Sequence, residues 1–117
     1  MQAVYDSGKL RLSVENWPIV VMELADGATK QEYVEVLDAM TKHVENRRQP
    51  FVTVTDSRRI RAIPPADVRK YIADWMALHA KTSRAVGAVT ILDSALMRGA
   101  LTALYWLFTP PTPQEYA

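Results

Sequence analysis

The sequence contains no cysteine among its 117 residues. This absence excludes disulfide bonds, thiolate metal ligands and a cysteine nucleophile, and it is compatible with the reducing cytoplasm, where we expect the protein to act. The sequence also lacks any run of about 18 apolar residues, the length that a membrane-crossing helix needs. Residues 1–6 lack the basic stretch and apolar segment that begin a secretory signal peptide, so we expect no membrane span and no export.

An excess of charge of one sign is also absent. The chain has 14 Lys+Arg and 13 Asp+Glu, which gives a net charge of +1. Such a protein has no overall field to attract nucleic acid or an anionic membrane, so we expect neither as a partner. Glycine is scarce, with four residues, and neither G-x-x-x-x-G-K nor G-x-G-x-x-G occurs, which excludes the common phosphate-binding loops.

What is present is the composition of an ordinary folded protein. Hydrophobic residues make up 49% and charged residues 23% of the chain, which is outside the range of disordered or fibrous sequences. A chain of this length has room for one hydrophobic core. We therefore expect a single domain over residues 1–117.

The first half of the chain predicts a hairpin, a strand and a helix. Polar and apolar residues alternate over residues 9–14, and a turn signal at 6–8 separates them from a short partner strand at 3–5. Residues 19–24 are almost all apolar and β-branched, which is typical of a central strand buried on both faces. Apolar residues at helical spacing then predict an amphipathic helix from Thr29 to about Arg47.

The second half repeats the strand and helix alternation. Pro50 precedes a strand over residues 51–55 that ends at Asp56-Ser57, and Pro64-Pro65 begins a second helix. A third strand covers residues 85–92. Asp93 and Ser94 can cap a third helix over residues 95–108, which the proline-rich residues 109–113 end.

This order of elements predicts an α/β fold. An N-terminal hairpin is followed by α-β-α-β-α, and each strand–helix–strand unit favours a parallel pair with a right-handed connection. We expect a mixed sheet with parallel central strands and covering helices.

Three segments together resemble a known family. They are the leading hairpin, the strand over residues 51–57, and the segment VGAVTILDSALMRGALTALYWLF at 86–108 with its proline-rich exit. They resemble the STAS fold (sulphate transporter and anti-sigma-factor antagonist), in particular the small bacterial SpoIIAA-like proteins. The resemblance implies a regulatory or scaffolding domain that acts through protein contacts, with no catalytic activity and no cofactor.

The sequence departs from that family in two places. The family carries a phosphorylated serine at the start of the helix after the second long strand, but residues 63–67 contain no hydroxyl, and Ser57 lies in the preceding loop. The phosphorylation switch therefore does not carry over. The family also has a short strand and a closing helix after the proline stretch, and only residues 114–117 follow it here, so a terminal strand or helix after residue 113 can be missing.

Two strands are expected to end alike, in Asp56-Ser57 and Asp93-Ser94. Parallel strands place their carboxyl ends at one edge of the sheet, where α/β proteins bind ligands, so these residues and Arg98 could line a pocket for a small molecule or lipid. Paired carboxylates could also bind Mg²⁺ or share a proton. The alternative is that Asp and Ser are simply the preferred residues of turns and helix N-caps, and we assign no metal ligand.

Basic residues gather at the same edge. Arg58, Arg59 and Arg61 are expected in a loop, with Arg98 in the first turn of the third helix, where they could bind an anion or an acidic partner. The alternative is a solvated loop in which Arg59 or Arg61 pairs with Asp56 or Asp93.

The expected third helix carries apolar residues over about 220° of its circumference, more than one sheet face requires. This width favours a protein interface, most simply a homodimer. Its contact residues would be Met97, Leu101, Leu104 and Phe108. The alternative is that the second and third helices pack together. Because no nucleophile–base pair or metal cluster is evident, we predict no enzymatic activity.

Overall fold

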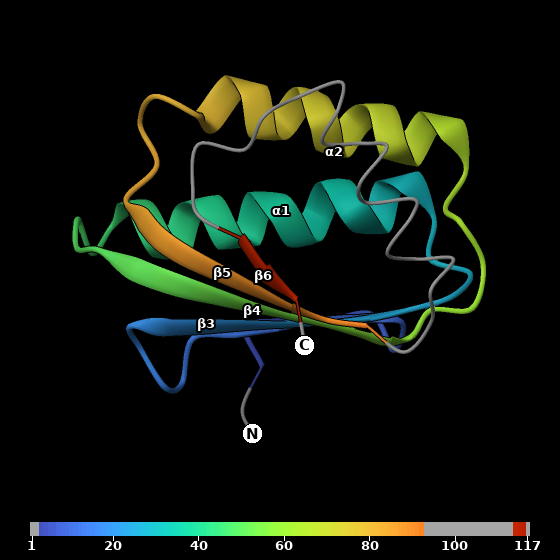
Figure 1. Ribbon diagram of the computed structural model, residues 1–117, viewed down its shortest axis with the longest axis horizontal. Coiled ribbons are helices and arrows are strands. Elements are labelled where there is room, and N and C mark those ends of the chain that lie inside the picture. Colours follow the sequence, from blue (N-terminus) through green and yellow to red (C-terminus); the bar gives the residue numbers. More distant parts are fainter. Residues whose placement is uncertain (1–2, 93–113, 117) are drawn as a thin grey trace.

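One mixed sheet with two helices on one face forms the framework of the protein (Figure 1). The computed structural model describes residues 3–92 and 114–116, and the fold is given for these residues. The six strands lie in the order in which they occur along the chain. The elements are β1 Tyr5–Asp6, β2 Leu10–Ser13, β3 Ile19–Ala25, α1 Lys30–Glu45, β4 Phe51–Arg59, α2 Ala66–His79, β5 Ala85–Ile91 and β6 Gln114–Tyr116.

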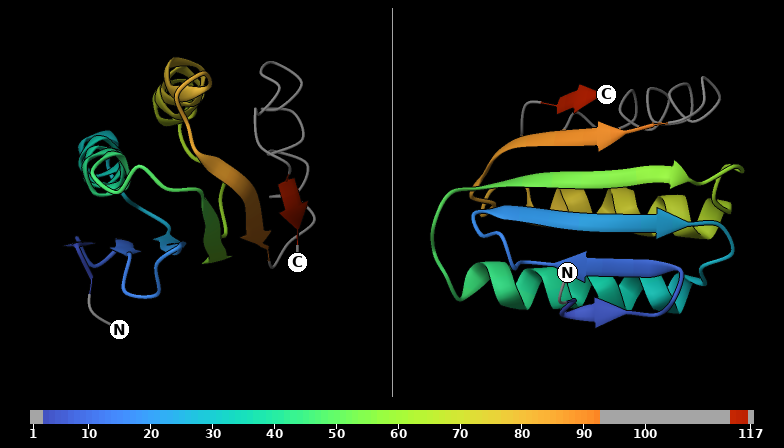
Figure 2. Two further views of the ribbon diagram at one scale, coloured as in Figure 1. Left: turned by 90° about the vertical axis from the view of Figure 1, so that its left-hand side faces the viewer. Right: turned by 90° about the horizontal axis from the view of Figure 1, so that it is seen from below.

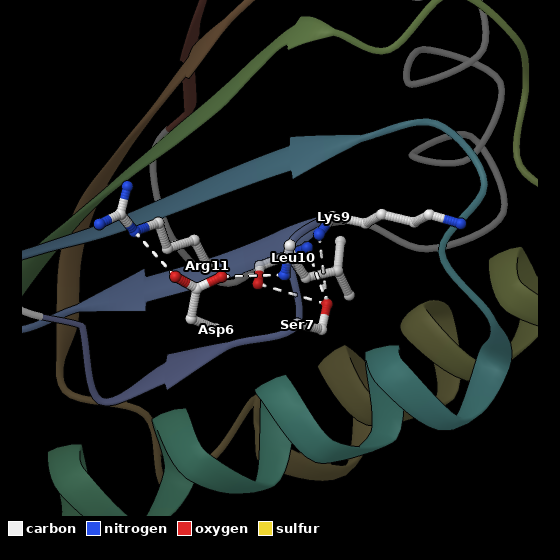
Figure 3. A network of polar contacts seen from close by, with 6 residues as sticks. Asp6, Ser7, Lys9, Leu10 and Arg11 are labelled. Atoms are coloured by element: carbon white, nitrogen blue, oxygen red, sulfur yellow. Dashed lines mark hydrogen bonds and ion pairs between the residues drawn. The ribbon is translucent and has the colours of Figure 1, made fainter.

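The expected N-terminal hairpin is confirmed: β1 pairs antiparallel with β2, and β2 pairs antiparallel with β3. The turn between β1 and β2 is held by short side chains (Figure 3). Asp6 Oδ1 accepts a hydrogen bond from the Gly8 amide at 2.9 Å, and Ser7 Oγ accepts one from the Leu10 amide at 3.1 Å. Gly8 has a φ of +87°, a conformation that residues with a Cβ rarely adopt, so this position favours glycine.

The other strands are parallel, and β3, β4 and β5 are joined through helices. The connection through α1 leads from β3 to β4, and the connection through α2 leads from β4 to β5. Two crossovers of the same hand that advance in the same direction place their helices on the same face of a sheet. Both helices accordingly lie behind the sheet in the right-hand view of Figure 2.

Helix α1 begins where the sequence predicts. Thr29 is its N-cap and forms a capping box, in which Thr29 Oγ1 accepts from the Glu32 amide at 3.1 Å and Glu32 Oε1 accepts from the Thr29 amide at 3.0 Å. Tyr33, Val36 and Leu37 are buried against the sheet. Helix α2 begins directly after Pro65, as expected.

The core lies between the sheet and the two helices. Leu10 and Leu12 are completely buried, so the residues that alternate with them on β2 identify the opposite face. The expectation that residues 19–24 are buried on both faces is wrong for Ile19, which is 43% exposed. The buried cluster consists of Leu10, Leu12, Val14, Val20, Tyr33, Val36, Leu37, Phe51 and Val68.

Aromatic side chains close the core at the amino ends of the parallel strands. The Trp17 ring lies 5.8 Å from the Phe51 ring, and its Nε1 donates to Gln49 Oε1 at 2.8 Å. The Arg47 guanidinium sits 4.8 Å from the centre of the Trp17 ring, an arrangement typical of a cation–π contact. The segment between α1 and β4 is thereby fixed against the segment before β3.

Two expectations about the strands are wrong. Strand β4 does not end at Asp56-Ser57 but continues to Arg59, because Asp56 is paired with Glu23 of β3 and with Ile91 of β5. Backbone pairing on both sides therefore overrides the turn preference of Asp-Ser. In addition, a short strand does follow the proline-rich stretch, since β6 pairs with β5. The expected third helix at 95–108 lies outside the described residues.

Replacing Leu12 with alanine tests the position of the core. Leu12 is 0% exposed, so Leu12→Ala should lower the free energy of unfolding by about 2–5 kcal/mol. The matched control is Leu78→Ala on α2, because Leu78 is 75% exposed and its truncation should change stability by less than about 0.5 kcal/mol. Urea unfolding followed by circular dichroism measures both. Equal losses for the two variants would contradict this assignment of the core.

Candidate functional site

The carboxyl ends of β3 and β4, with the connections that follow them, form the region that sequence analysis singles out. We call this region the carboxyl edge; its charged residues are Asp26, Asp56, Arg58, Arg59 and Arg61. Asp26 follows β3, Arg58 and Arg59 are the last residues of β4, and Arg61 lies in the connection to α2. Arg58 and Arg59 are therefore strand residues and not loop residues as expected, because β4 extends farther than the Asp-Ser pair suggests.

Asp56 and Arg58 form the strongest ion pair of this edge. The register between β3 and β4 shifts here, because Glu23 pairs with Asp56 and Ala25 pairs with Arg59, and the side chains of Asp56 and Arg58 meet at this irregularity. The Arg58 Nη2 to Asp56 Oδ2 distance is 2.7 Å, and the Arg58 Nε and amide nitrogen donate to Asp56 Oδ1 at 3.0 and 3.1 Å. The Arg58 guanidinium, helped by this amide, holds the pKa of the Asp56 carboxyl below its usual value of 3.8, while partial burial opposes the shift.

A second carboxylate joins the two connections at this edge. Asp26 Oδ2 accepts from the Arg61 amide at 2.9 Å, and Asp26 Oδ1 accepts from the Ala62 amide at 3.3 Å. The Arg61 Nη1 also donates to the Arg58 carbonyl at 2.8 Å. The backbone of the segment from Arg58 to Ala62 is thus held at both ends. Sequence analysis missed this role of Asp26, because its partners lie 35 and 36 positions away along the chain.

Asp56 and Ser57, two residues of the ligand pocket expected from the sequence, differ in their surroundings. Asp56 lies on the face of the sheet opposite the helices, whereas Ser57 is only 4% exposed. Adjacent strand residues normally point in opposite directions, but the register of β4 against β3 shifts directly after Asp56, so a shared pocket for Asp56 and Ser57 stays a prediction. The ion-pair partner that the structure shows for Asp56 is Arg58, whereas the expected pairing of Arg59 or Arg61 with Asp56 or Asp93 stays a prediction.

Several of the predicted residues cannot be placed. Asp93, Ser94 and Arg98 lie outside the described residues, so their expected meeting with Asp56 stays a prediction. The same holds for the apolar contact surface of the expected third helix. Its residues are Met97, Leu101, Leu104 and Phe108.

A hollow of about 250 Å³ opens at the carboxyl edge between the connections that follow β3 and β4. Most of the residues that line it are apolar, and the two with polar groups in their side chains are Asp26 and Tyr33. Burial raises the pKa of the Tyr33 hydroxyl, and the Asp26 charge acts in the same direction. Neither Asp56 nor Ser57 lines it. The lining residues are Ala25, Asp26, Gly27, Ala28, Tyr33, Ile60, Ala62, Ile63, Pro64 and Pro65.

Within residues 3–92 and 114–116, three or more His, Asp or Glu side chains nowhere gather closely enough to hold a metal ion. Neither α1 nor α2 is long and apolar enough to cross a membrane.

Comparisons with protein-family models, with curated proteins and with solved structures give no match for this chain. The α/β class and the mixed sheet with parallel β3, β4 and β5 rest on the structure itself. The resemblance to STAS domains stays a prediction from the sequence.

The pKa of Asp56 provides a test of its ion pair. In Arg58→Met the pKa should rise towards 3.8, because the guanidinium that favours the carboxylate is gone. A carboxyl whose pKa is lowered by folding contributes stability above about pH 4, and this contribution disappears as the pH falls through the folded-state pKa. The stability difference between wild type and Arg58→Met should therefore be present at pH 7 and absent in strong acid.

Carboxyl ¹³C chemical shifts titrated by NMR give the pKa of Asp56 directly. The control is Arg69→Met, since Arg69 is exposed on α2 and should leave the Asp56 titration unchanged. An unchanged Asp56 pKa in Arg58→Met would contradict the ion pair.

Proposed function

We propose that this protein is a non-catalytic, STAS-like regulatory or scaffolding domain that recognises an acidic surface of a protein partner at its carboxyl edge and also self-associates. The observation that carries the proposal is the combination of exposed arginines with a fixed backbone. Arg59 and Arg61 are exposed, while Asp26 and Asp56 hold the segment that carries them.

Such an arrangement favours recognition for a physical reason. A flexible basic loop loses conformational entropy when it binds, whereas a segment already held in one conformation loses less. Guanidinium groups also suit carboxylates, because they can donate two parallel hydrogen bonds. Charges at the rim of an interface mainly set partner choice and association rate, which is the property that a regulatory domain needs.

A second proposal is a binding site for a small, largely apolar molecule or a lipid chain. The hollow beside Tyr33 supports it, because apolar lining with a few polar groups is typical of small-molecule sites. Asp26 would not serve as a free ligand group there, since both of its carboxylate oxygens already accept backbone hydrogen bonds. A ligand would therefore be held mainly by apolar contact with residues such as Ile60 and Ile63.

Reversal of charge at Arg59 tests the partner proposal. Affinity capture with mass spectrometry identifies the partner, and titration of the two purified proteins then measures the dissociation constant. Arg59→Glu should weaken binding about tenfold or more, equivalent to about 1.4 kcal/mol, and the wild-type complex should weaken as salt is raised. The matched control is Arg69→Glu, an equal charge change at an exposed position of α2. Equal affinities for the two variants would exclude the carboxyl edge as the binding surface.

Filling the hollow tests the ligand proposal. Native mass spectrometry of the purified protein should show a bound molecule that Ala28→Leu no longer retains, because the larger side chain occupies the same space. Ala77→Leu, on the exposed surface of α2, serves as the control and should retain the molecule. A mass equal to that of the chain alone, with no change in Tm across a panel of fatty acids and small aromatic acids, would count against this function.

A further inference from the structure

The face of the sheet opposite the helices carries three rows of side chains, which we call the open face. The rows follow from the strand register, because residues paired across neighbouring strands point to the same side. The first row is Ile19, Val52 and Gly87; the second is Ser13, Val21, Val54 and Val89; the third is Asp6, Arg11, Glu23, Asp56 and Ile91.

Two of these rows are almost entirely apolar, although no described element lies over them (Figure 2, right). Ile19 is 43% exposed, and Val21, Val54 and Val89 are each partly exposed, whereas Ser13 at the β2 end of the second row is buried. Sheets with parallel strands are normally covered on both faces, because their strands carry apolar residues on both sides. The open face therefore has the composition of a surface that a second layer covers.

Gly87 points to the same conclusion. A Cβ built at Gly87 would meet Val52 Cγ2 at 4.0 Å, an ordinary contact, and nothing closer among the described residues. Glycine weakens a strand interior, and the φ of Gly87 lies outside the left-handed region. The register between β4 and β5 shifts next to it, because Phe51 pairs with Ala85 and Val52 with Gly87, and a strand glycine marks either such a bulge or a place where another backbone approaches closely. The open face is the side on which such an approach would occur.

We propose that the open face binds the open face of a second copy of this chain, forming a symmetric β-sandwich between protomers. The inference deepens the proposed function and rests on it, because it assigns the self-association to a surface. Two identical sheets have the same strand spacing and twist, which is the condition for aligned face-to-face packing. In a twofold dimer each surface meets its own copy, so the apolar rows of the two protomers cover one another.

The charges of the third row suit a second copy of this chain better than a partner whose surface carries charge of only one sign. The row holds acidic Asp6, Glu23 and Asp56 together with basic Arg11, and Arg58 binds Asp56 at its end. Arg11 Nε lies 3.5 Å from Asp6 Oδ2 (Figure 3), and Arg58 is bound to Asp56, so at least two of the three carboxylates are paired within one protomer. A strongly acidic or basic partner would meet like charge on this row, whereas a copy meets a mixture.

The size of the face sets the extent of the contact. Four strands about 4.8 Å apart with three rows about 7 Å apart give roughly 400 Å² in projection. Each partner of a standard interface buries about 800 Å², so the three rows supply about half of this area and the rest must come from the rim of the open face. The charged row must then lie inside the contact, which is why its internal ion pairs matter.

Two substitutions on the open face provide the test. Val54→Lys places a charge in the middle row, and Gly87→Ala adds a single methyl group at the proposed close approach. In analytical ultracentrifugation, wild type should be a dimer of the 13.2 kDa chain; Val54→Lys should weaken dimerisation about 100-fold or more, and Gly87→Ala about fivefold or more. Leu78→Lys, on exposed α2, is the control and should leave the dimer intact.

Urea unfolding at a concentration where each protein is monomeric separates misfolding from lost association. Gly87→Ala should then have an equal or higher midpoint than wild type, because the methyl group has room and alanine restricts the unfolded chain. A midpoint clearly below that of wild type would mean that the described chain itself requires a glycine at this position. Gly87 would then give no support to a close approach by a second copy.

The other outcomes are equally decisive. A monomeric wild type at all concentrations, or a dimer that survives Val54→Lys but is lost in Leu101→Asp on the expected third helix, would overturn the proposal. Binding of the purified partner by Val54→Lys with wild-type affinity would show that the carboxyl edge acts independently. Loss of the dimer with intact partner binding thus tests this inference, whereas loss of partner binding in Arg59→Glu with an intact dimer tests the proposed function.

Discussion

The two helical connections between parallel strands advance across the sheet in the same direction, and the rest of the structure depends on this constraint. Each step from β3 to β4 to β5 moves to the adjacent strand, so α1 and α2 lie on one face. That face receives the buried cluster around Leu12, Val36 and Phe51. In the part of the chain that the structure describes, no helix covers the opposite face, so its valines and isoleucines have to be explained by something other than the core.

The carboxyl edge shows how two short acidic side chains can organise a connection without any metal or disulfide. Asp26 binds two backbone amides of the chain after β4, and Asp56 binds both the side chain and the amide of Arg58. Carboxylates that accept several hydrogen bonds are favoured in their charged form, which agrees with the lowered pKa of Asp56. The positions of the basic residues are therefore set by acidic residues, and the three arginines at this edge outnumber its two aspartates.

The sequence predicted those elements whose pattern is local. Alternation over residues 9–14, helical spacing after Thr29 and the pair Pro64-Pro65 each indicate one element, and the structure has all of them. The predicted end of a strand at Asp56-Ser57 was wrong, because the turn preference of these residues is weaker than backbone pairing of Asp56 with a strand on each side. Asp26 was missed because its partners are distant in the chain. The contributions expected from Asp93 to Phe108 stay predictions, as does the STAS resemblance on which the proposed regulatory role depends.

The outer strands of the sheet determine whether further chains can add to its edges. Exposed strand edges present unpaired amides and carbonyls that can recruit further chains into open-ended assemblies. Here the two edge strands are short, with β1 spanning two residues and β6 spanning three. The β1 edge also carries the ion pair between Asp6 and Arg11. Among the described residues, lateral growth by strand addition is therefore disfavoured at both edges, because each offers few backbone groups for pairing.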